Sequence, residues 1–307
     1  MWWIVAGLVA VIAGLPVLAW WRRRPMDKAA RKDAPGRFAE LGRGVTHYQW
    51  DGPLRGPVAV CVHGLTTPAY VWDALVGGLT RMGYRVLRYD LYGRGLSDRP
   101  AGAQDCDFFV TQLEDLLRDQ EIDGGITLLG YSMGGAIATC YAARHPEMLD
   151  RLVMLAPAGL SYRPTRLAEV MRKLPAVGDW MMAVVGGWLM RRRLRADSAT
   201  PSVVAEIYAR QARETRYRGF PATVLSSIRH CLNSDTATQH KALAATDIPV
   251  LAIWGEADDV IGLEGLGRLA ELNRKARQAE IPKAPHSMVY THPPEVIGAM
   301  QEFLREV

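Results

Sequence analysis

A chain of 307 residues with 49% hydrophobic and 22% charged residues has the composition of a folded protein with a sizeable core, which excludes a disordered or fibrous chain. The four cysteines show neither CxxC nor metal-ligand spacing, so we expect no disulfide framework and no metal centre. The net charge of +5 is concentrated at residues 22–43 and 161–195, and no helix-turn-helix, zinc-finger or RNA-recognition pattern accompanies these clusters, so we expect no nucleic-acid partner.

Residues 2–21, WWIVAGLVAVIAGLPVLAWW, contain no charged residue and carry a tryptophan pair at each end. About 20 apolar residues match the hydrocarbon thickness of a bilayer, and tryptophan favours both of its interfaces. A cleaved signal peptide is the alternative, but the segment lacks a basic n-region and ends in LAWWRRRP, which offers no small-residue cleavage site. We therefore expect residues 1–22 to form a retained transmembrane anchor.

Basic residues follow this segment directly, beginning with Arg22, Arg23 and Arg24. The positive-inside rule predicts that the rest of the chain faces the cytoplasm. Residues 23–43 are then a basic linker that lies on the anionic lipid of the inner leaflet. The expected localisation is a membrane-anchored protein with its main domain in the cytoplasm.

Short β-rich apolar runs alternate with longer helical ones after residue 43. The predicted strands are 45–50, 58–64, 84–90, 126–132, 151–158 and 249–255, with helices over 69–83, 107–120 and 133–146 between them. This alternation predicts an α/β fold with a mostly parallel, doubly wound sheet covered by helices on both faces. Residues 159–245 contain no good strand and are too long for a simple connection, so we expect a helical cap between two core parts, residues 44–158 and 246–307.

The chemistry is expected at the motif GYSMG, Gly130 to Gly134, which follows a predicted strand and precedes a helix. A serine on such a sharp turn exposes its hydroxyl at the carboxyl edge of the sheet, so Ser132 is the predicted nucleophile. A serine hydroxyl needs a base, and that base needs an orienting carboxylate. His286 follows the last β-like run and is the predicted base among seven histidines. The carboxylate is Asp258 or its neighbour Asp259, which follow the strand that ends at Gly255.

An acyl-transfer reaction also needs donors for the developing oxyanion. The backbone N–H of Met133, directly after the nucleophile, is one predicted donor. The second is the N–H of Leu65, on the loop after the strand 58–64. His63 ends that strand, and we expect it to shape the loop rather than act as a base.

These motifs together resemble the α/β-hydrolase superfamily, in its subgroup of lid-bearing serine esterases and lipases. The resemblance runs from about Gly44 to the C-terminus, and the order Ser, Asp, His is the family's own. It rests on HG at 63–64, DLYGRGLSD at 90–98, GYSMGG at 130–135, WGEAD at 254–258 and PHS at 285–287. The family spacing favours Asp258 over Asp259 and implies no cofactor or metal. Pro285 stands where the family commonly has glycine, a departure that concerns the shape of the loop and not the identity of His286 as the base.

The segment Gly178 to Arg195, GDWMMAVVGGWLMRRRLR, lies within the predicted cap. Its stretch 180–190 has no polar face, yet it is too short to span a bilayer and is interrupted by two glycines. A buried cap helix and an interfacial membrane segment both fit this pattern. We expect Trp180, Met181 and Trp188 to contact the substrate.

The expected function is hydrolysis of a carboxylic ester with a lipid-like acyl group, of the monoacylglycerol or lysophospholipid type, through an acyl-enzyme. Membrane-anchored monoacylglycerol lipases, which this sequence resembles, share an N-terminal helix followed by this fold. The serine argues against dehalogenases and epoxide hydrolases, which resemble this pattern but use aspartate as nucleophile. A small-molecule esterase, a carbon–carbon bond hydrolase and a binding protein that has lost activity are the alternatives.

Overall fold

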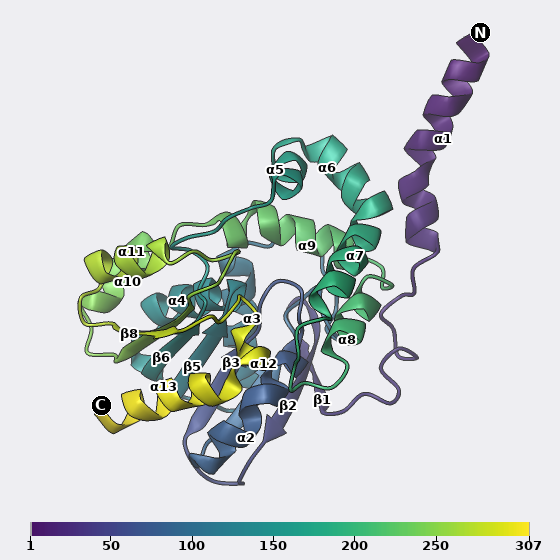
Figure 1. Ribbon diagram of the computed structural model, residues 1–307. Helices are drawn as coiled ribbons and strands as arrows, with labels where there is room; N and C mark the ends of the chain where they lie inside the picture. Colours follow the sequence, from purple (N-terminus) through teal and green to yellow (C-terminus); the bar gives the residue numbers. More distant parts are fainter. Residues whose placement is uncertain (1, 307) are drawn as a thin grey trace.

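The computed structural model describes residues 2–306 and contains an eight-stranded sheet (Figure 1). The strand order is β1-β2-β4-β3-β5-β6-β7-β8; β2 runs antiparallel to both of its neighbours, and all other pairs are parallel. The strands are β1 (Arg37–Leu41), β2 (Gly44–Asp51), β3 (Val58–Val62), β4 (Arg85–Tyr89), β5 (Ile126–Tyr131), β6 (Leu149–Leu155), β7 (Val250–Gly255) and β8 (Arg277–Ile281). The predicted mostly parallel sheet is confirmed.

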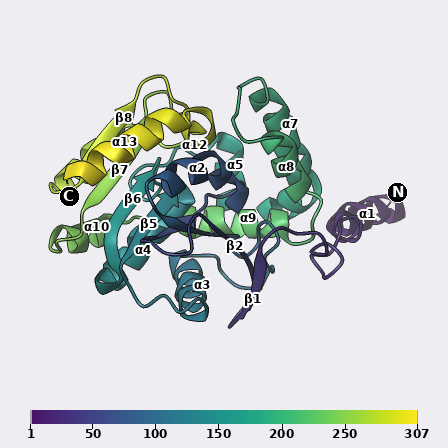
Figure 2. The ribbon, with the colours of Figure 1, turned by 90° about the horizontal axis from the view of Figure 1, so that it is seen from below.

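Helices cover both faces of this sheet, and each face has its own hydrophobic cluster (Figures 1 and 2). One cluster includes side chains of α3 (Cys106–Asp119), α4 (Met133–Arg144) and α11 (Glu264–Leu272). The other includes side chains of α2 (Asp73–Arg81), α12 (Met288–Thr291) and α13 (Pro293–Glu306). Every residue of β5 and β7 is buried, because these strands have helices above and below them.

The long connection between β6 and β7 is helical. It contains α5 (Arg166–Lys173), α6 (Pro175–Met181), the π-helix η3 (Met182–Gly186), α7 (Gly187–Asp197), α8 (Ile207–Glu214), α9 (Phe220–Arg229) and α10 (Ala237–Ala244). Helices α5 to α9 gather on one side of the molecule in Figure 1. In contrast, α10 packs against α4 and α11, so this last part of the segment 159–245 covers the sheet.

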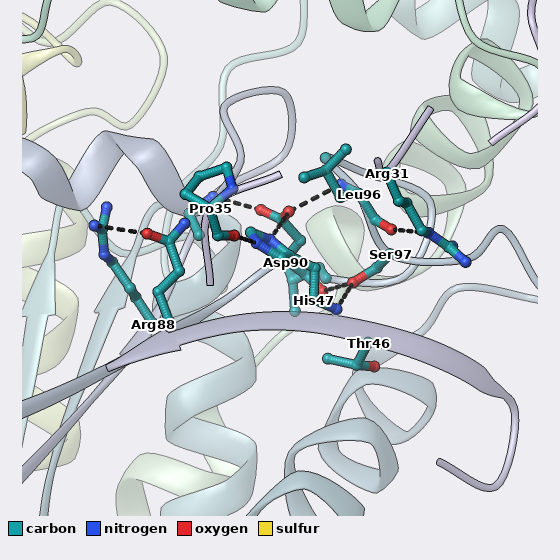
Figure 3. Close-up of polar contacts among 12 residues, drawn as sticks. Arg31, Pro35, Thr46, His47, Arg88, Asp90, Leu96 and Ser97 are labelled. Carbon is teal, nitrogen blue, oxygen red and sulfur yellow. Dashed lines mark hydrogen bonds and ion pairs between the residues drawn. The ribbon is translucent and has the colours of Figure 1, made fainter. Parts of the chain in front are cut away.

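The N-terminal end of helix α1 (Trp2–Trp21) projects beyond the rest of the chain, whereas the helix also contacts η3 (Figure 1). None of its residues is buried, and it is the one helix among the described residues that is long and apolar enough to cross a membrane. The segment after it returns along the protein. There Arg31 donates to the carbonyl of Leu96 at 2.9 Å and to Asp98 at 2.5 Å (Figure 3). Part of the predicted linker therefore lies on the protein itself.

Candidate active site

Ser132 sits on the turn between β5 and α4, in a backbone conformation that side chains rarely adopt, with φ 56° and ψ −119°. Its N–H donates to the carbonyl of Leu155 at 2.9 Å, which fixes the turn against the end of β6. The flanking glycines are required by close packing. A Cβ on Gly130 would lie 2.4 Å from the carbonyl oxygen of Gly134, and one on Gly134 would lie 2.1 Å from that of Val62.

A continuous hydrogen-bond chain connects Ser132, His286 and Asp258. The His286 Nε2 lies 3.0 Å from Ser132 Oγ, and its Nδ1 lies 2.7 Å from Asp258 Oδ2. A carboxylate only accepts hydrogen bonds, so Nδ1 carries the proton and Nε2 is free to accept the serine proton. Asp259 instead points to Arg193, 3.5 Å away, with an exposed side chain. The structure thus brings together the predicted trio with Asp258 as its carboxylate.

Backbone donors and a tyrosine hold the members of this trio in place. The second oxygen of Asp258 accepts hydrogen bonds from the N–H groups of Val260 and Ile261, both at 2.8 Å. The Tyr131 hydroxyl donates to the carbonyl of His286 at 2.9 Å, and its ring stacks on the imidazole at 5.5 Å. Sequence reasoning missed Tyr131, although it lies directly before the nucleophile in the GYSMG motif.

The loop after β3 lies directly against the nucleophile. A Cβ on Gly64 would approach the Ser132 Cβ to 3.2 Å, which is tighter than an ordinary van der Waals contact, so a glycine favours this close approach of the loop. Within residues 2–306, neither the Leu65 N–H nor the Met133 N–H donates to a protein acceptor. These two donors, both predicted from the sequence, are therefore free to bind an oxyanion.

A buried arginine, Arg94, binds the backbone of the loop after β3. Arg94 is fully buried, and burial lowers the pKa of its guanidinium to about 9. Its Nε donates to the Leu65 carbonyl at 3.0 Å, and its Nη atoms reach Gln104 at 2.5 Å and Ser227 of α9 at 2.7 Å. Arg94 thereby connects the predicted oxyanion loop to a helix of the β6–β7 connection.

His63 has structural surroundings, as expected, and so does Asp90. Buried His63 accepts a hydrogen bond at Nε2 from the N–H of Leu91 at 2.9 Å, and burial lowers its pKa to about 4, so it is neutral. Asp90 accepts from His47 Nδ1 at 2.8 Å and from the N–H of Leu96 at 2.9 Å (Figure 3). Burial alone would raise the pKa of Asp90, but the bond to His47 and its charge lower it to about 2.

A cavity of about 700 Å³ opens beside Ser132 and His286. Its walls come from the core and from α5, η3, α7, α8 and α9. The apolar lining residues include Leu65, Leu167, Met171, Met182, Leu189, Met190, Leu194, Phe220, Val224, Ile228, Leu232 and Val260. A second hollow of about 480 Å³ is lined by residues 36, 37, 48–54 and 85, and none of the predicted site residues lines it.

The structure does not place the three predicted substrate contacts in this cavity. Trp180, Met181 and Trp188 are absent from its lining, whereas Met182 and Met190 belong to it. Each tryptophan lies two residues from one of these methionines, which is about 200° around a helix, so it faces the opposite side. Trp180 instead donates to the carbonyl of Ile12 at 2.8 Å, and Trp188 is 53% exposed.

Named relatives carry several different activities. The chain is 25% identical over 259 residues to a putative non-heme chloroperoxidase of a Synechocystis species, covering 81% of this chain and 92% of the relative. It is 28% identical over 255 residues to a haloalkane dehalogenase of Mycolicibacterium paratuberculosis, covering 77% of each chain. It is 28% identical over 284 residues to a 2-hydroxymuconate semialdehyde hydrolase of a Pseudomonas species, covering 89% of this chain and 97% of the relative.

Solved structures share the same fold at lower identity. An enol-lactonase from Burkholderia xenovorans superposes with a TM-score of 0.71 at 21% identity, covering 88% of this chain and 100% of the other. A bromoperoxidase from Bacillus anthracis gives 0.73 at 21% identity, covering 88% and 99%. The family model described as the alpha/beta hydrolase fold matches residues 57–293. The chain therefore belongs to the α/β-hydrolase superfamily.

Proposed function

We propose that this protein is a membrane-anchored serine hydrolase that cleaves carboxylic esters with a lipid-like acyl group. The observation that carries the proposal is the hydrogen-bond chain from Asp258 through His286 to Ser132, which opens into a mostly apolar cavity. His286 takes the proton as Ser132 Oγ attacks the ester carbonyl, and the N–H groups of Leu65 and Met133 bind the oxyanion. His286 then returns the proton to the leaving alcohol, and water releases the acyl group from the serine.

The serine nucleophile limits the chemistry. If Ser132 displaced a halide or opened an epoxide, the covalent intermediate on the serine would be an ether. Water does not cleave an ether at neutral pH, so the enzyme would not turn over. Attack on an acyl carbon gives an ester instead, which a water activated by His286 can hydrolyse. Turnover through a covalent intermediate therefore favours acyl transfer over the haloalkane chemistry named for one relative.

The charge of the cavity favours a neutral substrate. Among the described residues that line it, Arg193 is the sole lysine or arginine. Asp197 and Asp259 lie 3.6 and 3.5 Å from this guanidinium, so its charge is already matched. A substrate carboxylate would find no free cation there. A neutral lipid ester, such as a monoacylglycerol, fits these walls better than the hydroxymuconate semialdehyde named for one relative, which carries a carboxylate.

Membrane attachment is proposed from α1 and the basic residues after it. A retained span of 20 apolar residues, followed by Arg22 to Arg24, would leave the hydrolase part on the cytoplasmic side. The intact mass of the purified protein tests cleavage, and protease protection in sealed vesicles tests orientation. Loss of residues 1–22 from the mature protein would overturn the anchor.

A fluorophosphonate probe and an ester series test the reaction. We expect wild type to react with the probe and Ser132→Ala to stay unlabelled. Turnover should rise from acetate to long-chain esters, because the apolar walls bind the added methylenes. Undiminished labelling of Ser132→Ala would overturn the nucleophile. A steep preference for acetate or butyrate would favour a small-molecule esterase, and a wild type that the probe does not label would favour a binding protein.

A further inference from the structure

The anchor helix and the β6–β7 connection satisfy each other's polar groups. Pro16 lies inside α1 and has no N–H, so the carbonyl of Ile12, four residues earlier, lacks its usual helical donor. Trp180 Nε1 donates to this carbonyl at 2.8 Å. An indole N–H and a carbonyl both need partners in an apolar environment. This contact supplies both, and it does so only while α1 lies against α6 and η3.

A second set of contacts holds the C-terminal end of α1 and the residues that follow it. Arg23 Nη2 donates to the carbonyl of Ala183 in η3 at 2.7 Å. Arg24 and the segment 216–218 exchange two backbone hydrogen bonds, at 2.9 and 2.8 Å. The guanidinium of Arg218 lies 4.1 Å from the centre of the Trp20 ring. The helix is thus attached at its middle and at its end, which fixes its direction relative to α6 and η3.

The contact between Trp180 and the Ile12 carbonyl determines how deep Trp180 lies in a bilayer that α1 spans. Ile12 precedes Trp21 by nine residues, which corresponds to about 14 Å along a helix. The hydrocarbon core of a bilayer is about 30 Å thick. If α1 spans it, Ile12 and Trp180 lie near the middle of the bilayer. Helices α6 and η3 are then within the adjoining leaflet rather than on its surface.

The outer surface of the segment from α5 to α7 is suited to contact with lipid. Four large apolar side chains between α5 and α7 lie outside the cavity lining and are exposed by a third or more of their area: Val170, Leu174, Val177 and Trp188. The acidic side chains of α5 and α6 are paired, because Asp179 pairs with Arg229 at 2.6 Å, and Arg229 also donates to the carbonyls of Met171 and Pro175. Glu169 likewise pairs with Arg172 and Lys173. Paired charges tolerate a low dielectric far better than free ones.

We propose that α1 docks α6 and η3 into the lipid leaflet, so that the active-site cavity is separated from acyl chains by one helix. Met182 and Gly186 of η3 line the cavity, while the same π-helix contacts α1. Substrate would then be taken from the leaflet and not from water. The inference rests on the proposed membrane anchor and names the lipid leaflet as the source of the ester.

Depth-dependent quenching of a fluorescent label tests this docking. The full chain is placed in vesicles of phosphatidylcholine and phosphatidylglycerol, with bimane on Val177→Cys in one sample and on Leu54→Cys in another. Both side chains are exposed, at 50% and 95%, but Leu54 lies in the turn between β2 and β3. We expect lipid with a mid-chain doxyl group to quench the Val177 label several-fold more than the Leu54 label, and aqueous iodide to do the reverse. The unsubstituted protein gives the background from native cysteines.

Two variants test the contact itself. Trp180→Phe removes the donor, and Pro16→Leu supplies an N–H that takes the Ile12 carbonyl back into the helix. Each variant should increase the quenching of the Val177 label by iodide and decrease its quenching by doxyl lipid. Trp188→Phe should change neither. Equal iodide quenching at Val177 and Leu54 in wild type would overturn the docking. If instead an alkaline carbonate wash strips the protein from vesicles, the proposed anchor itself has failed.

Discussion

Asp258 and Asp259 are adjacent in the chain but lie in different surroundings. Asp258 is buried and bonds to His286 at 2.7 Å, whereas the exposed Asp259 lies 3.5 Å from Arg193. Loss of the orienting carboxylate leaves the base in the wrong tautomer, so we expect Asp258→Asn to lower kcat by about ten-thousand-fold. Exposed ion pairs contribute little, so Asp259→Asn should stay within about twofold of wild type. Ester hydrolysis measures both, and equal losses would contradict the assignment.

Gln211 is a candidate contact for the alcohol part of the substrate. It lines the cavity at 5% exposure, and its Nε2 has no hydrogen-bond partner within the described chain. A buried donor without a partner costs about 1–3 kcal/mol, which an oxygen of the substrate would recover. We expect Gln211→Leu to raise KM for a monoacylglycerol about 5- to 150-fold, while KM for the methyl ester of the same acid barely changes. Equal effects on the two esters would remove Gln211 from alcohol recognition.

Glu214 connects helix α8 to the loop after β4. Its carboxylate accepts from the N–H of Gly95 at 2.9 Å and lies 3.8 Å from Arg99. Burial raises the pKa of Glu214 to about 7, against the opposing charge of Arg99. The ordinary glutamate pKa in an unfolded chain is about 4.3. The folded state therefore binds this proton more tightly, and its stability falls as pH rises from about 4 to about 7.

Glu214→Gln separates the pH dependence of stability caused by Glu214 from that caused by other titrating groups, because glutamine keeps an acceptor for the Gly95 N–H but carries no charge. We expect the variant to gain thermal stability over wild type as pH rises from about 4 to about 8, with little difference at the acid end. Melting temperatures of the detergent-purified proteins measure the gap. A gap that stays constant with pH would mean that Glu214 does not titrate in this range.

Sequence patterns predicted local features well and contacts through space poorly. The strand–GYSMG–helix context located Ser132, since local geometry alone demands those glycines. The segment 180–190 is apolar on all sides, so its periodicity could not tell that Trp180 faces α1 while Met182 faces the cavity. The two edge strands, β1 and β8, also escaped prediction, because a strand with one neighbour keeps polar side chains and shows no apolar run.

A substitution at Trp188 tests whether the membrane delivers the substrate to the active site. Its ring is 53% exposed, lies outside the cavity lining and stands 5.6 Å from the Arg192 guanidinium, an arrangement suited to a lipid headgroup interface. A glutamate there would oppose both the apolar contact and anionic lipid. We expect Trp188→Glu to reduce hydrolysis of a long-chain ester in anionic vesicles several-fold and to spare a soluble short-chain ester. Equal losses on both substrates would show that the residue supports the fold of the active site rather than its contact with the bilayer.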